Sequence, residues 1–399
     1  MSGAMPSGPA VGPCAGLRVV DLSTMVSGPM CGRILADFGA DVIKVESLEG
    51  DMMRSLPPLH RGLSGYFLQY NRNKRGVALD LKSARGRALA TALAGTADVL
   101  IENFRPGVAE RLQLDHARLQ PANPRLIYVS INGFGDDGPY AGQPAYDPVI
   151  QGLTGFMPVQ GRDGPPLPIR NPVVDKVAAQ SAAIAVLAAL NHRHASGRGQ
   201  RITVPMLTAW AAFVLPEMMH GETYPDVESG PPPARDAFRV LETSDGHVVG
   251  IVLQDSQFEG LCRLLGRADL LGDPLFATPA ARVANAALLH ERVRDDARRL
   301  STADFVAGAR AHGVPFAPVN DLAGFLADPQ VRHMAAYRDV EDPELGRVRH
   351  LGLMAGFAGS PCAPPRRAPR LGEHTDEILG ELGHAADELA AFRREGAIA

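Results

Sequence analysis

The chain has 399 residues, of which 45% are hydrophobic, so it is long enough to bury sizeable cores in two or three structural units. Its formal net charge of −4 indicates no bulk attraction to nucleic acid or to an anionic membrane. No run of apolar residues reaches the roughly 18 that a membrane-spanning helix needs.

The N-terminal stretch MSGAMPSGPAVGPCAG lacks the basic and apolar regions of a signal peptide. We therefore expect residues 1–16 to form a flexible leader. The cysteines Cys14, Cys31, Cys262 and Cys362 are widely spaced, with no CxxC pair. This spacing supports neither a disulfide framework nor a zinc site, and it is typical of a protein in a reducing cytoplasm.

Short runs rich in β-branched residues alternate with helical patterns after the leader. The expected strands are LRVVDL (17–22), DVIKVE (41–46), VALDLK (77–82), ADVLIEN (97–103) and RLIYVSI (125–131). Between them we expect a helix in SGPMCGRILADFGA, a helix capped by Ser83, and a short helix near 107–114. This alternation predicts an α/β fold with a mostly parallel, doubly wound sheet, whose ligands bind beyond the carboxyl ends of the strands.

The sequence of the second half of the chain predicts the end of this first domain and the start of another. A long small-residue helix over about 175–194 stops at NHRHASGRGQ and leads into the strand RITVP. The proline-rich GETYPDVESGPPPARD then reads as a linker. A hairpin turning at Asp245-Gly246 follows, and later a helix opened by the cap in STADF (301–305).

These signals predict five consecutive parts. They are a leader at 1–16, a large Rossmann-like domain at 17–220, a linker at 221–236, a smaller α+β domain at 237–325, and a return linker with the C-terminal part of the large domain at 326–399.

The segment INGFGDDGPY contains a formal GxGxxG pattern at Gly133, Gly135 and Gly138. A dinucleotide-binding fingerprint places its third glycine inside an opening helix, whose amides meet the pyrophosphate. Here Pro139 and YAGQPAYDP follow, and this sequence does not form a helix. We therefore reject dinucleotide binding through these glycines.

Asp175 stands at the start of the long helix, in NPVVDKVAAQ. Aspartate is a preferred N-cap residue, worth roughly 1 kcal/mol there. A carboxylate at a helix N-terminus also stays ionised and, if accessible, acts as a nucleophile. The local sequence does not separate a cap from a reagent.

Several segments in order resemble the family III CoA-transferases, which include formyl-CoA transferase and carnitine CoA-transferase. They are LRVVDLSTMVSGPMCGRILADFGADVIKVES, NRNKRGVALDLKS, ADVLIENFRPGVAERL, LIYVSINGFGDDGPYAGQPAYDPVIQGLTGF, the helix of Asp175, SGRGQRITVPML, GVPFAPVNDL and GEHTDEILGELG. The resemblance covers nearly the whole chain beyond residue 16. It implies acyl-CoA and a carboxylic acid as substrates, and an interlocked homodimer of ring-shaped subunits.

The resemblance implies that Asp175 is the nucleophile, which attacks an acyl-CoA thioester to form an aspartyl-acyl anhydride and then an enzyme-bound thioester. Tyr146, in PAYDP, matches a transferase tyrosine and is expected to donate a hydrogen bond to a developing oxyanion. The related racemases carry a histidine base there, and a tyrosine with a pKa near ~10 is a poor base. A loop aromatic packed on the core is the plain alternative for Tyr146. Tyr66 matches a second, weaker active-site position.

Matching positions also predict the CoA-binding residues. They are Leu79, Lys82, Asn103, Phe104 and Arg111, with Arg105 as a further phosphate candidate. Cations are expected to meet the phosphates, and Phe104 is expected to flank the pantetheine arm or the base. The plain alternatives are solvated surface charges for Lys82 and Arg111 and core packing for Phe104.

Departures from the formyl-CoA transferases concern the substrate. Ser47 stands where they have arginine, Val26 replaces a glutamine at a weaker substrate-binding position, and HVVGIVLQDSQF has no glycine-rich loop. We therefore expect a larger acyl group, such as the dicarboxylate succinyl, in place of formyl or oxalyl.

Other functions stay open beside CoA transfer. An acyl-CoA racemase or epimerase of the same family would exchange an α-proton, and a non-catalytic CoA-binding protein would form no covalent intermediate. A nucleotide-dependent oxidoreductase is opposed by the broken glycine pattern. No histidine spacing fits a metal site, so we expect no metal and no tightly bound cofactor.

Overall fold

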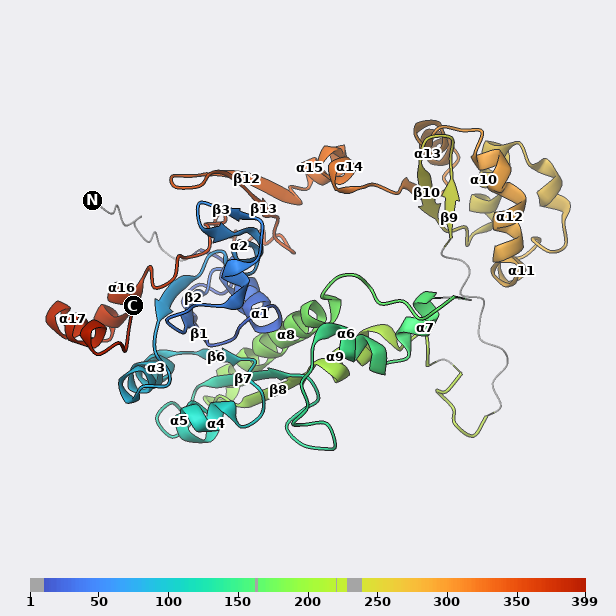
Figure 1. The fold of residues 1–399 in the computed structure, drawn as a ribbon. Helices are drawn as coiled ribbons and strands as arrows, with labels where there is room; N and C mark the ends of the chain where they lie inside the picture. Colours follow the sequence, from blue (N-terminus) through green and yellow to red (C-terminus); the bar gives the residue numbers. More distant parts are fainter. Residues whose placement is uncertain (1–10, 162–163, 220, 228–238) are drawn as a thin grey trace. The chain divides into compact units, whose positions relative to one another are not determined.

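The computed structural model describes residues 11–161, 164–219, 221–227 and 239–399 (Figure 1). The chain divides into two compact units. The first comprises Met1–Pro216 and Ala335–Ala399, and the second comprises Glu217–Met334. Residues 1–10 of the expected leader and 228–236 of the expected linker lie outside the described residues.

The first unit contains a six-stranded sheet, parallel throughout, with the order β5-β2-β1-β6-β7-β8. Its strands are β1 (Arg18–Asp21), β2 (Asp41–Glu46), β5 (Arg75–Ala78), β6 (Val99–Glu102), β7 (Ile127–Asn132) and β8 (Arg201–Pro205). The chain runs outward from β1 on one side and from β6 on the other, as in doubly wound folds. The predicted parallel sheet is confirmed, and β1 and β6 flank its topological switch point.

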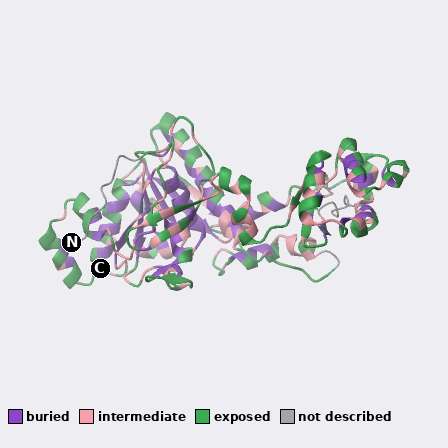
Figure 2. Cartoon of the chain, turned by 90° about the horizontal axis from the view of Figure 1, so that it is seen from above, coloured by how far each residue is buried: buried purple, intermediate pink, exposed green. Residues whose placement is uncertain are grey.

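Both faces of this sheet are covered, which explains the near-continuous apolar strands. Side chains alternate along β1, so that Val19 joins one core cluster and Val20 joins the other. Residues of α1 (Ser27–Asp37), α8 (Val173–Ser196) and α9 (Met206–Val214) belong to the first cluster. Residues of α3 (Ala84–Thr96), α5 (His116–Leu119), α16 (Thr375–Glu381) and α17 (Ala386–Arg394) belong to the second. Figure 2 shows the buried residues gathered along the sheet between these helix layers.

Smaller elements complete the first unit. They are η1 (Met52–Ser55), β3 (Leu59–His60), β4 (Leu63–Ser64), α2 (Gly65–Asn71), α4 (Val108–Leu112), α6 (Asp147–Leu153), α7 (Phe156–Gly161), β12 (Tyr337–Asp342) and β13 (Gly346–Leu351). The expected short helix near 107–114 is confirmed as α4, which ends at Leu112 because Gln113 adopts a positive φ of 62°. The cap at Ser83 is confirmed, since its side chain accepts a hydrogen bond from Gly86 N–H.

The flexible leader was expected to reach residue 16, and this boundary is wrong for its last residues. Cys14 is buried in the first core cluster, and its N–H donates to the Phe38 carbonyl at 2.9 Å. Leu17 N–H in turn bonds the Cys14 carbonyl. An apolar thiol packed under the end of α1 therefore orders this stretch.

By length and composition, α8 is a helix that could cross a membrane, with a mean hydropathy of 1.7 over its best window. It nevertheless packs on α1, α9, β7 and β8. Val174, Ala178, Ala182 and Val186 are fully buried along one of its faces. Its apolar character is therefore that of a core helix.

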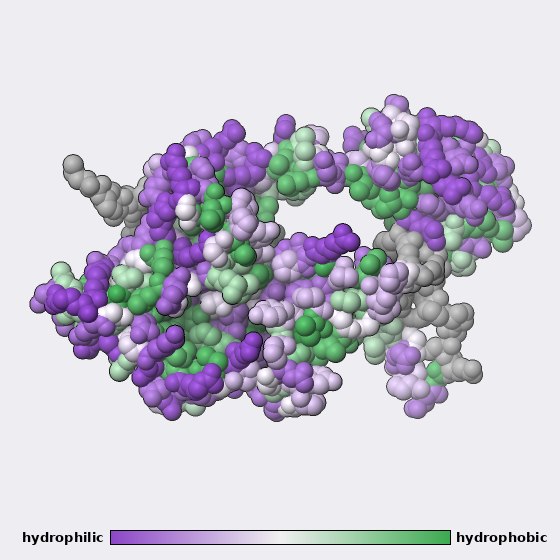
Figure 3. All heavy atoms as spheres, viewed as in Figure 1, coloured by the Kyte–Doolittle hydropathy of each residue, from purple (hydrophilic) through white to green (hydrophobic). Residues whose placement is uncertain are grey.

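The second unit has its own core and a three-stranded antiparallel sheet in the order β11-β10-β9. Its elements are β9 (Val240–Glu242), β10 (His247–Gly250), α10 (Asp255–Leu265), η3 (Ala268–Gly272), α11 (Pro279–Ala284), α12 (Ala286–Ala297), α13 (Thr302–Ala311), β11 (Phe316–Pro318), α14 (Leu322–Ala327) and α15 (Pro329–His333). The hairpin between β9 and β10 and the Ser301 cap of α13 are confirmed. The face of this unit seen in Figure 3 is largely hydrophilic.

A buried ion pair ties the C-terminal segment to the first half of the chain. Asp37, at the end of α1, accepts hydrogen bonds from Arg72 Nε at 2.9 Å and Nη2 at 2.7 Å, and from Asn73 at 2.7 Å. The fully buried Arg72 guanidinium also donates to the carbonyl of Leu351, at the end of β13.

We expect Asp37→Ala to destabilise the first unit by about 3–5 kcal/mol, because it leaves the Arg72 guanidinium buried without its carboxylate. Urea unfolding followed by circular dichroism measures the loss. Asp339→Ala, which breaks the exposed pair of Asp339 with Arg349, is the control and should change the midpoint little. Equal losses in the two variants would contradict the role of burial.

Candidate active site

The switch point of the sheet brings together two loops that follow β1 and β6. Leu22 N–H bonds the Ile101 carbonyl at 2.8 Å, and the two chains then separate. Beyond this point the Asn103 side chain spans the gap, accepting from Thr24 N–H at 2.9 Å and donating to the Thr24 carbonyl at 2.7 Å. A doubly wound sheet binds ligands in such a crevice.

Asp175 lies in the first turn of α8, as the third residue of the helix. The N-cap position is Pro172, which offers no side-chain hydrogen bond. The cap comes from elsewhere: Asp147 Oδ2, at the start of α6, accepts from Val174 N–H at 2.6 Å and from Asp175 N–H at 3.3 Å. The hypothesis that Asp175 caps its own helix is therefore wrong, and its carboxylate is free for another purpose.

The Asp175 carboxylate meets the beginning of α1. The hydroxyl and the backbone of Ser27, the first residue of α1, both act on this carboxylate and lower its pKa. Two helix N-termini thus face this carboxylate, and each favours negative charge.

Burial and, after it, the nearby Asp147 charge raise the pKa of Asp175 to about 6, against the opposing effect of Ser27. At neutral pH such a carboxylate is mostly ionised. It is also more basic than an ordinary aspartate, and therefore a better nucleophile.

Three tyrosines belong to the elements around this carboxylate, and one of them, Tyr70, interacts with its charge. Tyr146 is the N-cap residue of α6 directly before Asp147, and it is 63% exposed. Tyr66 on α2 is 52% exposed. One turn later, Tyr70 is partly buried, and burial followed by the Asp175 charge raises the pKa of its hydroxyl. Tyr70 was not predicted from the sequence, although its spacing of four residues from Tyr66 places both on one face of a helix.

Two cations lie near the same carboxylate. Lys176 is partly buried, and burial lowers the pKa of its ammonium group, which Asp147 opposes and Arg33 reinforces. Arg33 on α1 is 7% exposed, and its Nε has no hydrogen-bond partner. Its guanidinium also acts on the hydroxyl of Tyr70. Neither cation was predicted from the sequence.

Two predicted binding residues have buried side chains. Leu79 is fully buried in the second core cluster and pairs with Ile398. Val26 is 8% exposed and packs with Met53 and Phe67 between α1 and α2. Neither side chain can contact a ligand directly in this arrangement. Leu79 follows a strand and Val26 precedes a helix, and the aliphatic side chains at both positions pack into the core.

The other predicted CoA-binding residues lie at the carboxyl edge of the sheet. Lys82 and Arg111 are exposed, as a phosphate ligand requires. Both N–H groups of the Asn103 amide are already used by Thr24 and Ser27, so this side chain has no free donor for a phosphate. The Asn103 amide is thus bonded within the protein, and its expected part in CoA binding stays a prediction.

Phe104 and Arg105 line a cavity of about 280 Å3 beyond β6 and β7. Four acidic residues and one further arginine also line it, namely Glu102, Glu110, Asp115, Asp136 and Arg201. Acidic groups outnumber basic ones, so this cavity does not match the phosphates of CoA. Lys82 and Arg111 lie outside its lining.

The segment carrying Gly133, Gly135 and Gly138 does not open a helix. Asn132 Oδ1 accepts from Gly135 N–H at 2.6 Å and folds the chain into turns, and α6 begins only at Asp147. The rejection of a dinucleotide fingerprint therefore agrees with the backbone. Among the described residues, no group of His, Cys, Asp or Glu side chains is arranged to hold a metal ion, and the expectation of a metal-free enzyme stays a prediction.

Asp147 is the site residue that sequence reasoning missed. It is 6% exposed, and its oxygens accept from Gln151 and from the backbone of Val174 and Asp175. The dipeptide Asp147-Pro148 suggested only a local turn, and the contact with α8 spans 28 residues. The only sequence signal that could have identified Asp147 as a site residue is its position next to Tyr146.

Comparison with known proteins places the chain in a family. The sequence profile of CoA-transferase family III matches residues 14–375. A succinate–glutarate CoA-transferase of Agrobacterium fabrum is 35% identical, with 93% of this chain and 96% of that protein covered. A succinyl-CoA:mesaconate CoA-transferase of Haloarcula hispanica is 34% identical, with coverages of 92% and 96%. The crystal structure of a CAIB/BAIF family protein from Brucella suis superposes with a TM-score of 0.82 and 34% identity, covering 93% of this chain and all of that one.

The chain therefore belongs to CoA-transferase family III. It is a CoA-transferase enzyme, which moves CoA between an acyl-CoA thioester and a carboxylate.

The raised pKa of Asp175 predicts an effect on stability. The folded-state pKa of about 6 lies above the ordinary value of 3.8, so the ionised carboxylate destabilises the fold above pH 6, and the penalty disappears as the pH falls towards 4. We expect Asp175→Asn to raise the free energy of unfolding at pH 7.5 by up to about 2–3 kcal/mol. Urea unfolding at pH 7.5 and at pH 4.5 tests this, because the gain should shrink at the lower pH. A gain that is the same at both values would contradict the assigned pKa.

Proposed function

We propose that the enzyme transfers CoA through a covalent intermediate on Asp175. The observation that carries this proposal is a carboxylate released from helix capping by Asp147, partly buried, raised in pKa and held by Ser27 at the N-terminus of α1. A carboxylate spent on capping has its oxygens occupied, whereas this one is directed at a crevice where a ligand is expected.

The first half-reaction moves CoA from the donor acyl group to the enzyme. An Asp175 oxygen attacks the thioester carbonyl, the carbon–sulfur bond breaks, and CoA leaves as a thiolate, which gives an acyl-aspartyl anhydride. The thiolate then attacks the aspartyl carbonyl of this anhydride. The donor acid leaves as its carboxylate, and CoA is now bound to Asp175 as a thioester.

The second half-reaction reverses these steps with another acid. The acceptor carboxylate attacks the aspartyl thioester and expels CoA thiolate, which forms a new anhydride. The thiolate attacks the acyl carbonyl of that anhydride, and Asp175 leaves as a free carboxylate. Every step exchanges one acyl bond for another, so the thioester's free energy is retained and no nucleotide is consumed.

The surrounding groups have separate roles in this scheme. Tyr146 donates a hydrogen bond to the oxyanion that develops on the attacked carbonyl, and the Ser27 donors orient the carboxylate. Lys82 and Arg111 bind the CoA phosphates, Phe104 flanks the nucleotide or the pantetheine arm, and Tyr66 borders the acyl group. The family resemblance further supports an interlocked homodimer.

The acyl group that fits this site best is a dicarboxylate. Lys176 directly follows Asp175 in α8 and offers positive charge to a second carboxylate, which a formyl group lacks. Two relatives, 35% and 34% identical, are named for succinate and glutarate and for succinyl-CoA and mesaconate.

The covalent step predicts loss of activity in Asp175→Asn. We expect the rate to fall by at least about 10³-fold, because an amide does not form the anhydride. Mass spectrometry of the intact protein after incubation with succinyl-CoA should show an adduct on the peptide containing Asp175 in the natural enzyme and none in the variant. The rate of the natural enzyme should also fall below a pH of about 6, where Asp175 becomes protonated. Transfer at the natural rate by the variant would overturn the mechanism.

The dicarboxylate assignment predicts a selective effect of Lys176→Met, which keeps the length of the side chain and removes its charge. We expect the KM for succinate to rise about tenfold, while the KM for butyrate, of equal chain length, changes little. Steady-state rates with the two acceptors measure the difference. Lys82→Met is the control, because loss of a phosphate ligand should raise the KM for succinyl-CoA and leave the ratio between the two acids unchanged. Equal changes for succinate and butyrate in Lys176→Met would exclude this residue from acid recognition.

A further inference from the structure

The segment that follows β1 is shaped almost wholly by side chains from other parts of the chain. Five consecutive backbone N–H and C=O groups, from Ser23 N–H to Met25 N–H, each form a hydrogen bond with a side chain. Regular secondary structure would satisfy such groups with other backbone groups. The conformation of residues 23–25 therefore depends on the few side chains that reach it.

Asn103 holds this segment from the end of β6. Its amide bonds both backbone groups of Thr24. The same Nδ2 donates to Ser27 Oγ at 3.3 Å. Because the Ser27 oxygen accepts from Asn103, its own proton is left for another acceptor, and Ser27 is the residue that lowers the pKa of the Asp175 carboxylate.

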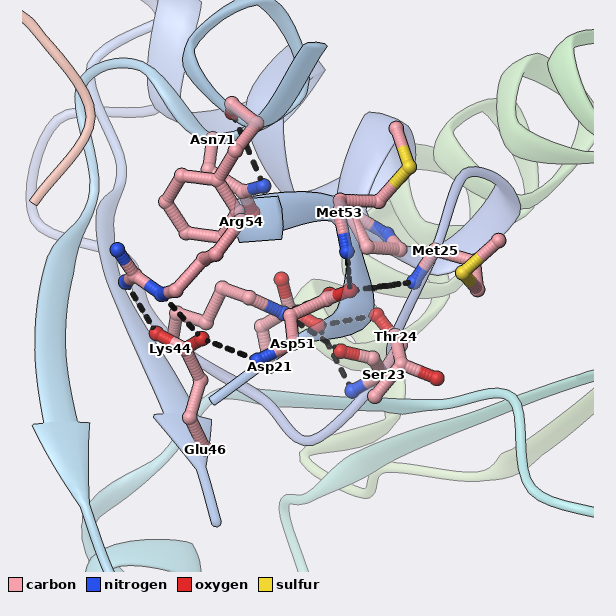
Figure 4. Close-up of polar contacts among 12 residues, drawn as sticks. Asp21, Ser23, Thr24, Met25, Lys44, Glu46, Asp51, Met53, Arg54 and Asn71 are labelled. Carbon is pink, nitrogen blue, oxygen red and sulfur yellow. Dashed lines mark hydrogen bonds and ion pairs between the residues drawn. The ribbon is translucent and has the colours of Figure 1, made fainter. Parts of the chain in front are cut away.

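Asp51 and Lys44 hold the segment from the other side, as Figure 4 shows. Asp51 Oδ2 accepts from Met25 N–H at 3.1 Å, and Lys44 Nζ donates to the Ser23 carbonyl at 2.7 Å. The two side chains pair with each other at 3.3 Å, and both are fully enclosed. This pair comes from β2 and the loop that enters η1.

Two features show how closely the segment is fixed. Met25 has a φ of 66°, a left-handed conformation that costs a non-glycine residue about 1–2 kcal/mol. A Cβ added at Gly28 would lie 2.2 Å from the Ser23 side chain and 3.6 Å from the Asn103 amide carbon. A strained residue and a close approach persist only where the neighbours hold them.

A second buried ion pair supports the same segment from beneath. Lys74 Nζ donates to Asp21 at 2.8 Å and to the Pro29 carbonyl in α1 at 2.8 Å. Asp21 accepts in turn from Ser23 N–H at 3.0 Å. The start of α1 is thus tied to the end of β1 by charged groups with no exposure to solvent.

We propose that Asn103 and Asp51 are positioning residues for the transfer reaction, which hold residues 23–27 between them so that Ser27, at the start of α1, keeps its place against α8 and Asp175. This inference rests on the proposed role of Asp175 as nucleophile. Neither residue touches the reacting atoms; each acts through the segment that carries Ser27.

The charges that face Asp175 are unchanged by substitution at Asn103. They include Asp147 on α6 and Tyr70 on α2, while Tyr66 and Arg33 act on Tyr70, and Lys176 is the next residue of α8. Ser27 is the group that lowers the pKa of Asp175. Loss of its orientation therefore raises this pKa and moves the acidic limb of the rate profile to higher pH.

The test compares Asn103→Ala with Asn123→Ala across pH 5 to 9. Asn123 is a matched control, because its amide also donates to backbone carbonyls, those of Ala97 and Ala94, at the opposite edge of the sheet. We expect the acidic limb of the pH profile of kcat to move to higher pH by about 0.5–1 unit in Asn103→Ala. In Asn123→Ala the limb should stay at the pH of the natural enzyme. Ser27→Ala should shift the limb equally, and the double variant of Ser27 and Asn103 should shift it no further.

A second variant, Asp51→Asn, tests the other side of the segment. Loss of a carboxylate charge alone lowers the pKa of a neighbouring acid, so an upward shift of the limb identifies release of Ser27. Asp98→Asn is its control, because Asp98 likewise accepts from a backbone N–H, that of Arg18, and pairs with Arg193 at the far edge of the sheet.

The outcomes separate the two proposals. An unmoved limb in Asn103→Ala and in Asp51→Asn, with folded protein by circular dichroism, overturns the positioning role even when kcat falls. An additive shift in the double variant overturns it as well. Failure of the natural enzyme to form either an acyl or a CoA adduct on Asp175 overturns the nucleophile instead, and the mass spectrum of the natural enzyme decides this independently of the variants.

Discussion

The hydrogen bonds from the start of α8 to Asp147 are the interaction on which the site depends. They satisfy backbone donors that would otherwise attract the carboxylate of the helix itself. The same contact places a second negative charge beside Asp175, which adds to the effect of burial on its pKa. One buried carboxylate therefore both releases the nucleophile and strengthens it, and the fold bears the electrostatic cost in reduced stability.

The sheet order explains how residues distant in sequence reach one crevice. Because β1 and β6 are neighbours at the switch point, the loops carrying Ser27 and Asn103 emerge side by side and then diverge. The contact between α1 and α8 brings the start of α8 to the same place. A parallel sheet with its strands in another order would place these groups at different edges.

The sequence predicts the parts of this structure that depend on local or periodic signals. Alternating apolar runs predicted the parallel sheet, and Ser83 and Ser301 predicted helix starts, because a cap lies within three residues of its partners. Contacts such as Asp147 with α8 and Asp51 with Met25 join elements through space, and neither residue carries a local signature. Leu79 and Val26 show the opposite error, since matching a family position does not reveal which way an aliphatic side chain points.

Buried charges have a property in the segment after β1 that apolar packing lacks. An aliphatic contact fixes distance loosely, whereas an ammonium or carboxylate with all its partners in place fixes direction as well. Lys44 and Asp51 satisfy each other and two backbone groups of a strained turn, so any shift of the turn leaves a charge unpaired in the interior. The arrangement is costly to assemble and resists displacement. Ser27 requires such a support if it is to keep its place beside the Asp175 carboxylate.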